Sequence, residues 1–118
     1  MTVHAELTAI VIDCAAPKEL AEFYHHLTGW EITHSDDDYA CLGNGPLRLA
    51  FPRVADYRGP AWPGSAHHAH LDFQVGDPEA TAKELIALGA SKPDFQPGDG
   101  QWTVLADPEG HPFCISAA

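Results

Sequence analysis

The segment HLDFQVGDPEAT, residues 70–81, gives the clearest indication of how this 118-residue chain folds. It begins with an alternation of polar and apolar residues that is typical of a half-buried β-strand. It then reaches Pro78, and proline is common in the first turn of a helix. The earlier segment LTAIVIDCAAPKEL, residues 7–20, has the same order, and its Pro17 precedes Pro78 by 61 residues. The chain therefore contains a strand followed by a proline-started helix twice.

The two halves also continue in the same way. Each predicted helix ends at a glycine, Gly29 or Gly89, as helices often do. Three short strand-like runs follow each glycine, at 30–33, 39–42 and 47–51 and then at 91–95, 102–106 and 112–116. These observations predict an α+β fold built from two βαβββ modules. We expect one domain over 1–118, with repeats 5–54 and 67–117 joined by the Pro/Gly-rich loop 55–66.

Composition excludes several classes of partner. The net charge is −11, with only six lysines and arginines, which disfavours nucleic acid and anionic membrane surfaces as partners. The sequence has no apolar run of membrane-spanning length and no apolar N-terminal segment of the signal-peptide type. Its three cysteines, Cys14, Cys41 and Cys114, form no CxxC pair. Free thiols and a cytoplasmic location are therefore expected.

Three segments resemble the glyoxalase, bleomycin-resistance and dioxygenase superfamily, also called the vicinal oxygen chelate superfamily. They are AEFYHHLTGWEI (21–32), HLDFQVGDPEAT (70–81) and VLADPEGHPFCI (104–115). The last is the most specific, because members commonly end with a DP-x-G turn and a final strand. The resemblance covers nearly the whole chain and is closest to small stand-alone glyoxalase-like domain proteins. It implies that each module curls into a half-barrel and that two half-barrels enclose a cavity. It also implies a homodimer, with modules paired within a chain or exchanged between chains.

Strand alternation predicts which side chains line that cavity. In the strand that ends at Val75, Leu71 and Phe73 share its apolar face, and the other face is polar. If the apolar faces pack against the helices, the polar faces line the cavity, with tryptophans as aromatic walls. The predicted cavity residues are Asp13, Arg48, Trp62, His68, His70, Asp72, Gln74, Trp102, Cys114 and Ser116. Trp30 and Phe51 are expected in the core.

The resemblance also gives a test for a metal site. Metal-dependent members hold an ion at four equivalent positions, which in this chain are Ala9, Ala50, His70 and Cys114. Alanine has no donor atom, so the expected site is degenerate and metal-free. The alternative is a three-ligand zinc site of His68, His70 and Cys114. In a metal-dependent relative the ion would be zinc, nickel, manganese or iron.

These observations do not decide whether the protein is a ligand-binding protein or an enzyme. The leading hypothesis is a small-molecule-binding protein or metal-independent enzyme relative, similar to the drug-sequestering resistance proteins of the superfamily. The alternative is a metal-dependent lyase, isomerase or dioxygenase acting on vicinal oxygens, with Asp13, Asp72 or His111 as general base. A third hypothesis is metal-free acid–base catalysis by His70 with Asp72. A fourth is an accessory domain whose partner is another protein.

Overall fold

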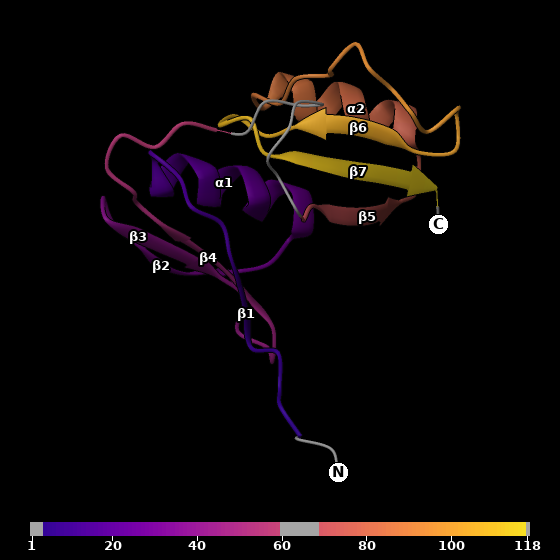
Figure 1. Cartoon of the computed structure of the whole chain (residues 1–118). Helices are drawn as coiled ribbons and strands as arrows, with labels where there is room; N and C mark the ends of the chain where they lie inside the picture. Colours follow the sequence, from indigo (N-terminus) through magenta and orange to yellow (C-terminus); the bar gives the residue numbers. More distant parts are fainter. Residues whose placement is uncertain (1–3, 60–68, 118) are drawn as a thin grey trace. The chain divides into compact units, whose positions relative to one another are not determined.

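The computed structural model describes residues 4–59 and 69–117 (Figure 1). The chain divides into two compact units, Met1–Tyr57 and Arg58–Ala118, and the described residues of each contain one sheet and one helix. No helix within the described residues combines the length and the apolar character that crossing a bilayer requires. The predicted doubling of a strand–helix–strand module is confirmed by this order of elements.

The first unit has a four-stranded sheet. Its strands are β1 (Ala9–Val11), β2 (Ile32–Ser35), β3 (Tyr39–Leu42) and β4 (Arg48–Pro52). Their order is β1-β4-β3-β2, with β1 and β4 parallel and the other pairs antiparallel. The helix α1 (Pro17–Thr28) lies along one face of this sheet (Figure 1). It belongs to the long connection that a parallel β1–β4 pair requires.

The local sequence explains both ends of α1. Pro17 occupies the first turn, where its missing N–H leaves no hydrogen bond unmade. Gly29 ends the helix with φ of +74°, and its N–H donates to the carbonyl of His25. The helix is fixed to the sheet by Tyr24, whose ring stacks on Phe51 of β4 with centroids 5.5 Å apart. Both rings are almost fully buried, and each contributes roughly 1.5–3 kcal/mol by burial.

The second unit has a three-stranded sheet. Its strands are β5 (Leu71–Val75), β6 (Thr103–Ala106) and β7 (Pro112–Ala117), in the order β5-β7-β6. β5 is parallel to β7, whereas β6 is antiparallel to it. The helix α2 (Pro78–Ala87) begins after Asp77, whose side chain accepts a hydrogen bond from the N–H of Ala80 at 3.1 Å. Figure 1 shows α2 beside the sheet of this unit.

The prediction of a strand at 91–95 is wrong. Only Ser91 pairs with the sheet, through an isolated bridge to the end of β6. Pro93 lacks the N–H that a strand would donate. The side-chain amide of Gln96 bonds Val104 of β6 instead, accepting from its N–H and donating to its carbonyl, both at 2.9 Å. One side chain therefore provides at this edge the pair of bonds that a neighbouring strand would make.

The strand predicted at 30–33 begins later, at Ile32. The backbone of Trp30 is held by the end of α1, because its N–H donates to Oγ1 of Thr28 at 3.0 Å. Its carbonyl also accepts from Nδ1 of His25 at 2.7 Å. These bonds keep Trp30 out of the sheet. The strands predicted at 39–42, 47–51, 102–106 and 112–116 all form, with ends that differ by no more than one residue.

Candidate functional site

The register of the second sheet brings polar side chains to one face. Asp72 is paired with Cys114 and Gln74 with Ser116, and directly paired residues project to the same side. The opposite face of these two strands carries their phenylalanines, whose rings lie edge to face with centroids 5.8 Å apart. Along β5 the polar residues are exposed and the apolar ones are half-buried. The predicted alternation of this strand is therefore confirmed.

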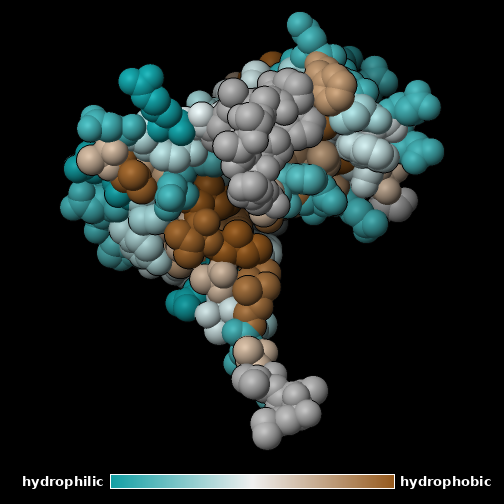
Figure 2. Space-filling model, in the orientation of Figure 1, coloured by the Kyte–Doolittle hydropathy of each residue, from teal (hydrophilic) through white to brown (hydrophobic). Residues whose placement is uncertain are grey.

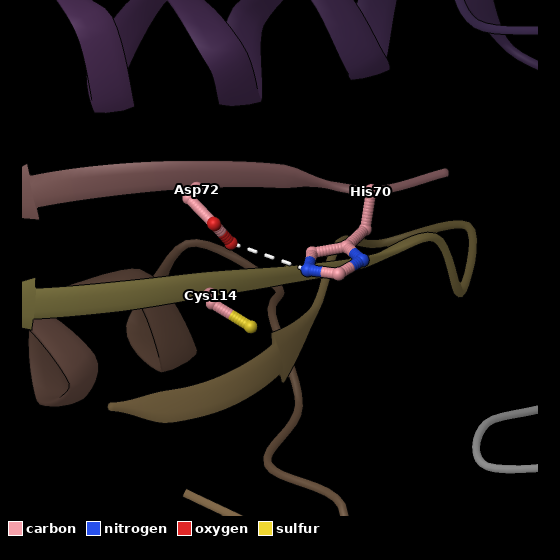
Figure 3. A group of neighbouring side chains, drawn as sticks. All are labelled: His70, Asp72 and Cys114. Atoms are coloured by element: carbon pink, nitrogen blue, oxygen red, sulfur yellow. Dashed lines mark ion pairs between the residues drawn. The ribbon is translucent and has the colours of Figure 1, made fainter. Parts of the chain in front are cut away.

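Three of the predicted residues form a cluster on the polar face, which we call the His70–Asp72–Cys114 cluster (Figure 3). His70 lies one residue before β5, and its Nε2 is 3.2 Å from Oδ1 of Asp72. One donor atom from each of the three side chains lies within 4.8 Å of the others. The contact between His70 and Asp72, which the sequence left open, is therefore present.

The members of the cluster differ in their access to solvent. The side chains of His70 and Asp72 are 40% and 77% exposed, whereas Cys114 is buried. Burial raises the pKa of the Cys114 thiol to about 11, and the neighbouring Asp72 carboxylate adds to the increase. The thiol is therefore protonated at neutral pH. An imidazole and a carboxylate are left to form hydrogen bonds with a molecule that approaches this face.

The first unit has no such cluster at the equivalent positions. The parallel register pairs Val11 with Ala50, as Asp72 is paired with Cys114 in the second unit. Ala9 lies two residues before Val11 and therefore corresponds to His70. None of these three side chains can coordinate a metal or form a hydrogen bond. Val11 is 60% exposed, and apolar side chains gather on part of the surface of this unit (Figure 2).

The other predicted cavity residues are distributed over both units. Asp13 and Arg48 belong to the first unit and are exposed. In the second unit, Gln74 is exposed, Ser116 is half-buried, and Trp102 is 41% exposed just before β6. Trp62 and His68 lie outside the described residues. That all ten residues line one cavity remains a prediction.

His111, considered above as a general base, is part of a turn. Its Nδ1 is 2.6 Å from Oδ2 of Asp107, whose side chain is fully buried. Oδ1 of Asp107 also accepts from the backbone N–H groups of Glu109 and His111. These bonds fix the turn that precedes β7. The DP-x-G turn is predicted by the sequence but this pair is not, although an aspartate four residues before a histidine at such a turn is a usable indication.

The cluster was also compared with the requirements of a metal ion. Imidazole, carboxylate and thiolate are all zinc ligands, with bond lengths of about 2.0–2.3 Å, which place donor atoms about 3.3–3.8 Å apart. The observed spread of up to 4.8 Å needs a small contraction, and the thiol must lose its proton. The residues therefore fit a three-ligand site with one open position. In this set of three ligands, Asp72 replaces His68, which the sequence predicted as the third ligand.

Three features define the class of fold. They are the order of the modules, the parallel strand pairs β1–β4 and β5–β7, and the one helix described in each unit. This fold is shared by a glyoxalase/bleomycin resistance protein/dioxygenase family enzyme from Burkholderia phytofirmans. That structure has a TM-score of 0.68 and 21% sequence identity, and the match covers 96% of this chain and 98% of the other. It is also shared by the bleomycin-binding protein of Streptomyces verticillus in complex with copper(II)-bleomycin. Here the TM-score is 0.58 and the identity 20%, over 99% of each chain.

The sequence match is more specific. The model of the glyoxalase-like domain family matches residues 9–116, and the chain belongs to this family. It is 33% identical over 97 residues to the Mycobacterium bovis protein named "Putative glyoxylase CFP32". That match covers 79% of this chain but 36% of the relative, so the chain spans about a third of the curated relatives it matches. The resemblance inferred from three segments is confirmed.

Proposed function

We propose that this chain binds a small organic molecule on the polar face of the β5–β7 sheet, through hydrogen bonds to the His70–Asp72–Cys114 cluster. The observation that carries the proposal is the convergence of an exposed imidazole and an exposed carboxylate over a buried thiol. A few convergent polar groups beside an apolar wall are the usual form of a small-molecule site. The fold shared with the bleomycin-binding protein supports a binding role.

We infer further that the two modules form one domain and that the residues predicted to line its cavity, including Trp62 and Trp102, contribute to one binding site. Its remaining polar groups are Asp13, Arg48, His68, Gln74 and Ser116. We infer a cytoplasmic protein that functions as a homodimer, in keeping with the family fold.

The chemistry of the cluster favours one class of ligand. Asp72 only accepts hydrogen bonds when ionised, whereas His70 can accept or donate. The chain carries a net charge of −11, which repels anions. A neutral or cationic molecule with N–H or O–H donors therefore fits better than a carboxylate or phosphate.

A ligand screen tests this proposal. Aromatic and antibiotic-like compounds would be screened by ligand-observed NMR against the protein and against Asp72→Asn and His70→Ala. Loss of a hydrogen bond to a charged group costs about 1.5–3 kcal/mol, so Asp72→Asn should weaken binding about tenfold or more. Glu79→Gln on α2 is the matched control and should have no effect. A compound that binds all four proteins equally would show that the site is placed wrongly.

A second candidate function is supported by the 4.8 Å spread of the three donor atoms. It is a metal-dependent enzyme that acts on a substrate with vicinal oxygens. His70, Asp72 and Cys114 would hold the ion, and a bound divalent ion supplies Lewis-acid polarisation of substrate oxygens. Nε2 of His70 and Oδ1 of Asp72 are 3.2 Å apart, so these two donor atoms would meet at the ion with little movement.

Metal content distinguishes the two candidates. Plasma mass spectrometry of the untagged protein should find a near-stoichiometric ion if the second candidate is correct. His70→Ala and Cys114→Ser should then each lose it. A protein that purifies without metal, and that shows no heat of binding with added zinc, nickel, manganese or iron, eliminates the second candidate and leaves the first.

A further inference from the structure

The first unit contains a recess that is separate from the cluster described above. It lies between the end of α1 and the turn that joins β3 to β4, is lined by residues 29–31 and 43–47, and has a volume of about 700 Å³. This volume is within the range of small-molecule sites. We call it the Trp30–Glu31 recess. Its lining includes one tryptophan, one carboxylate and two apolar side chains, Pro46 and Leu47, and contains no lysine or arginine.

Trp30 is the rigid wall of this recess. The sequence favoured a core position for it, but its side chain is only half-buried. Its backbone is held from both sides by Thr28 and His25, as described for the start of β2. Its ring lies against Gly43, where an added Cβ would be 3.3 Å from Cε3 of the indole and 3.0 Å from the carbonyl oxygen of Leu47. Gly43 has φ of +98°, so both the conformation and the space favour glycine.

Glu31 adds a carboxylate to the lining of the recess. Its Oε2 accepts a hydrogen bond from Nδ2 of Asn44 at 3.0 Å. Its backbone carbonyl accepts from the N–H of Gly43 at 2.7 Å, which ties the two sides of the recess together. No basic side chain of the described residues forms an ion pair with Glu31. The carboxylate is therefore oriented but not neutralised.

We propose that the Trp30–Glu31 recess binds an organic cation with an apolar body, such as an aromatic quaternary ammonium compound. The indole face attracts a cation through its quadrupole, and an adjacent carboxylate adds a full opposite charge. Pro46 and Leu47 provide apolar surface for the body of the ligand. The recess belongs to a different unit from the His70–Asp72–Cys114 cluster, so this site does not depend on the function proposed above.

The test uses phenyltrimethylammonium as the probe and tert-butylbenzene as its neutral isostere. In ¹⁵N-labelled protein, the Trp30 indole N–H signal, assigned with Trp30→Phe, should shift saturably with the cation and much less with the isostere. Glu31→Gln, which keeps an acceptor for Asn44, should weaken cation binding about threefold to tenfold. Trp30→Leu, followed at the backbone amide signals of Gly43–Gly45, should abolish it.

Two matched controls separate this site from nonspecific attraction to an acidic protein. Phe95→Leu and Glu79→Gln, both at exposed positions of the second unit, should leave cation binding unchanged, and amide spectra establish that each variant is folded. Equal binding of the cation and its isostere would overturn the proposal. So would a saturable shift that is unaffected by Glu31→Gln, or the absence of any saturable shift at Trp30.

Discussion

Single side chains determine the chemistry of the candidate site. Within the His70–Asp72–Cys114 cluster, the protonation state of Cys114 is the best defined. A thiol with a pKa of about 11 has little thiolate at pH 8, and thiolate is the reactive form. Asp72 contributes to this pKa through charge and a hydrogen bond. We therefore expect Asp72→Asn to speed alkylation of Cys114 by iodoacetamide at pH 8 severalfold, as followed by mass spectrometry. Cys14 and Cys41 are buried internal references, and an unchanged rate at Cys114 would contradict the role given to Asp72.

The Cys114 thiol also makes the free energy of unfolding depend on pH in the alkaline range. Its pKa in the folded chain is about 11, above the ordinary value of 9.0, so the unfolded chain loses its proton first as the pH rises. The stabilising contribution is complete below pH 9 and is lost as the pH rises from 9 to 11. The free energy of unfolding should fall by about 2 kcal/mol over this interval.

Urea unfolding at several pH values between 7 and 11 measures this loss. Cys114→Ser removes the titrating group and should flatten this part of the profile, even if the variant is less stable at every pH. An equally steep decline in Cys114→Ser would assign the alkaline loss to other groups.

The residues of the cluster were only partly predictable. The resemblance placed His70 and Cys114 at family positions, and strand alternation placed Asp72 on their face. Residues two apart on a strand are separated by roughly 6–7 Å along the backbone, so the sequence alone did not establish the 3.2 Å contact between His70 and Asp72. That contact depends on side-chain rotamers and on His70 lying just outside β5. The contact between Asp107 and His111 was missed for a similar reason, although the turn that contains it was predicted.

At the scale of elements, helix boundaries were predictable and one strand was not. Pro17 and Gly29 mark the ends of α1 through fixed backbone preferences, which depend only on local sequence. The missing strand at 91–95 depends instead on Gln96, whose side chain occupies the edge of β6. A side chain that bonds like a peptide group produces no periodic signal, so a pattern-based prediction cannot detect it.

This arrangement predicts a large effect at one polar residue. Gln96→Ala leaves the N–H and carbonyl of Val104 without their partner, and each such group costs about 1–3 kcal/mol if it stays dry. We expect a loss of about 2 kcal/mol or more in the free energy of unfolding, measured in urea. Gln101→Ala is the matched control for side-chain truncation and should change stability by less than about 0.5 kcal/mol. A similar loss in the free energy of unfolding for both variants would show that the Gln96 side chain does not stabilise the edge strand β6.

At the scale of the whole molecule, two modules of one architecture carry different chemistry. The equivalent positions hold His70, Asp72 and Cys114 in one unit but Ala9, Val11 and Ala50 in the other. The repeat is visible in the sequence because both modules contain a parallel strand pair, an antiparallel neighbour and a helix, with turns and helix ends at corresponding positions. The same patterns do not reveal whether both modules keep functional side chains, because a small side chain such as Ala50 or Cys114 fits a buried strand position whether or not it has a function.

The proposal of a single cavity makes a prediction at this scale. If both modules contribute to one site, Ala9→His combined with Ala50→Glu adds two donors to the three of the His70–Asp72–Cys114 cluster, which is enough for a complete zinc shell. Zinc affinity measured by calorimetry should then rise by at least a hundredfold over the unaltered protein, because each added ligand contributes binding free energy to the same ion. The gain should largely disappear when His70→Ala is added to the double variant. A gain that persists without His70 would place the new donors in a separate site and would contradict the shared cavity.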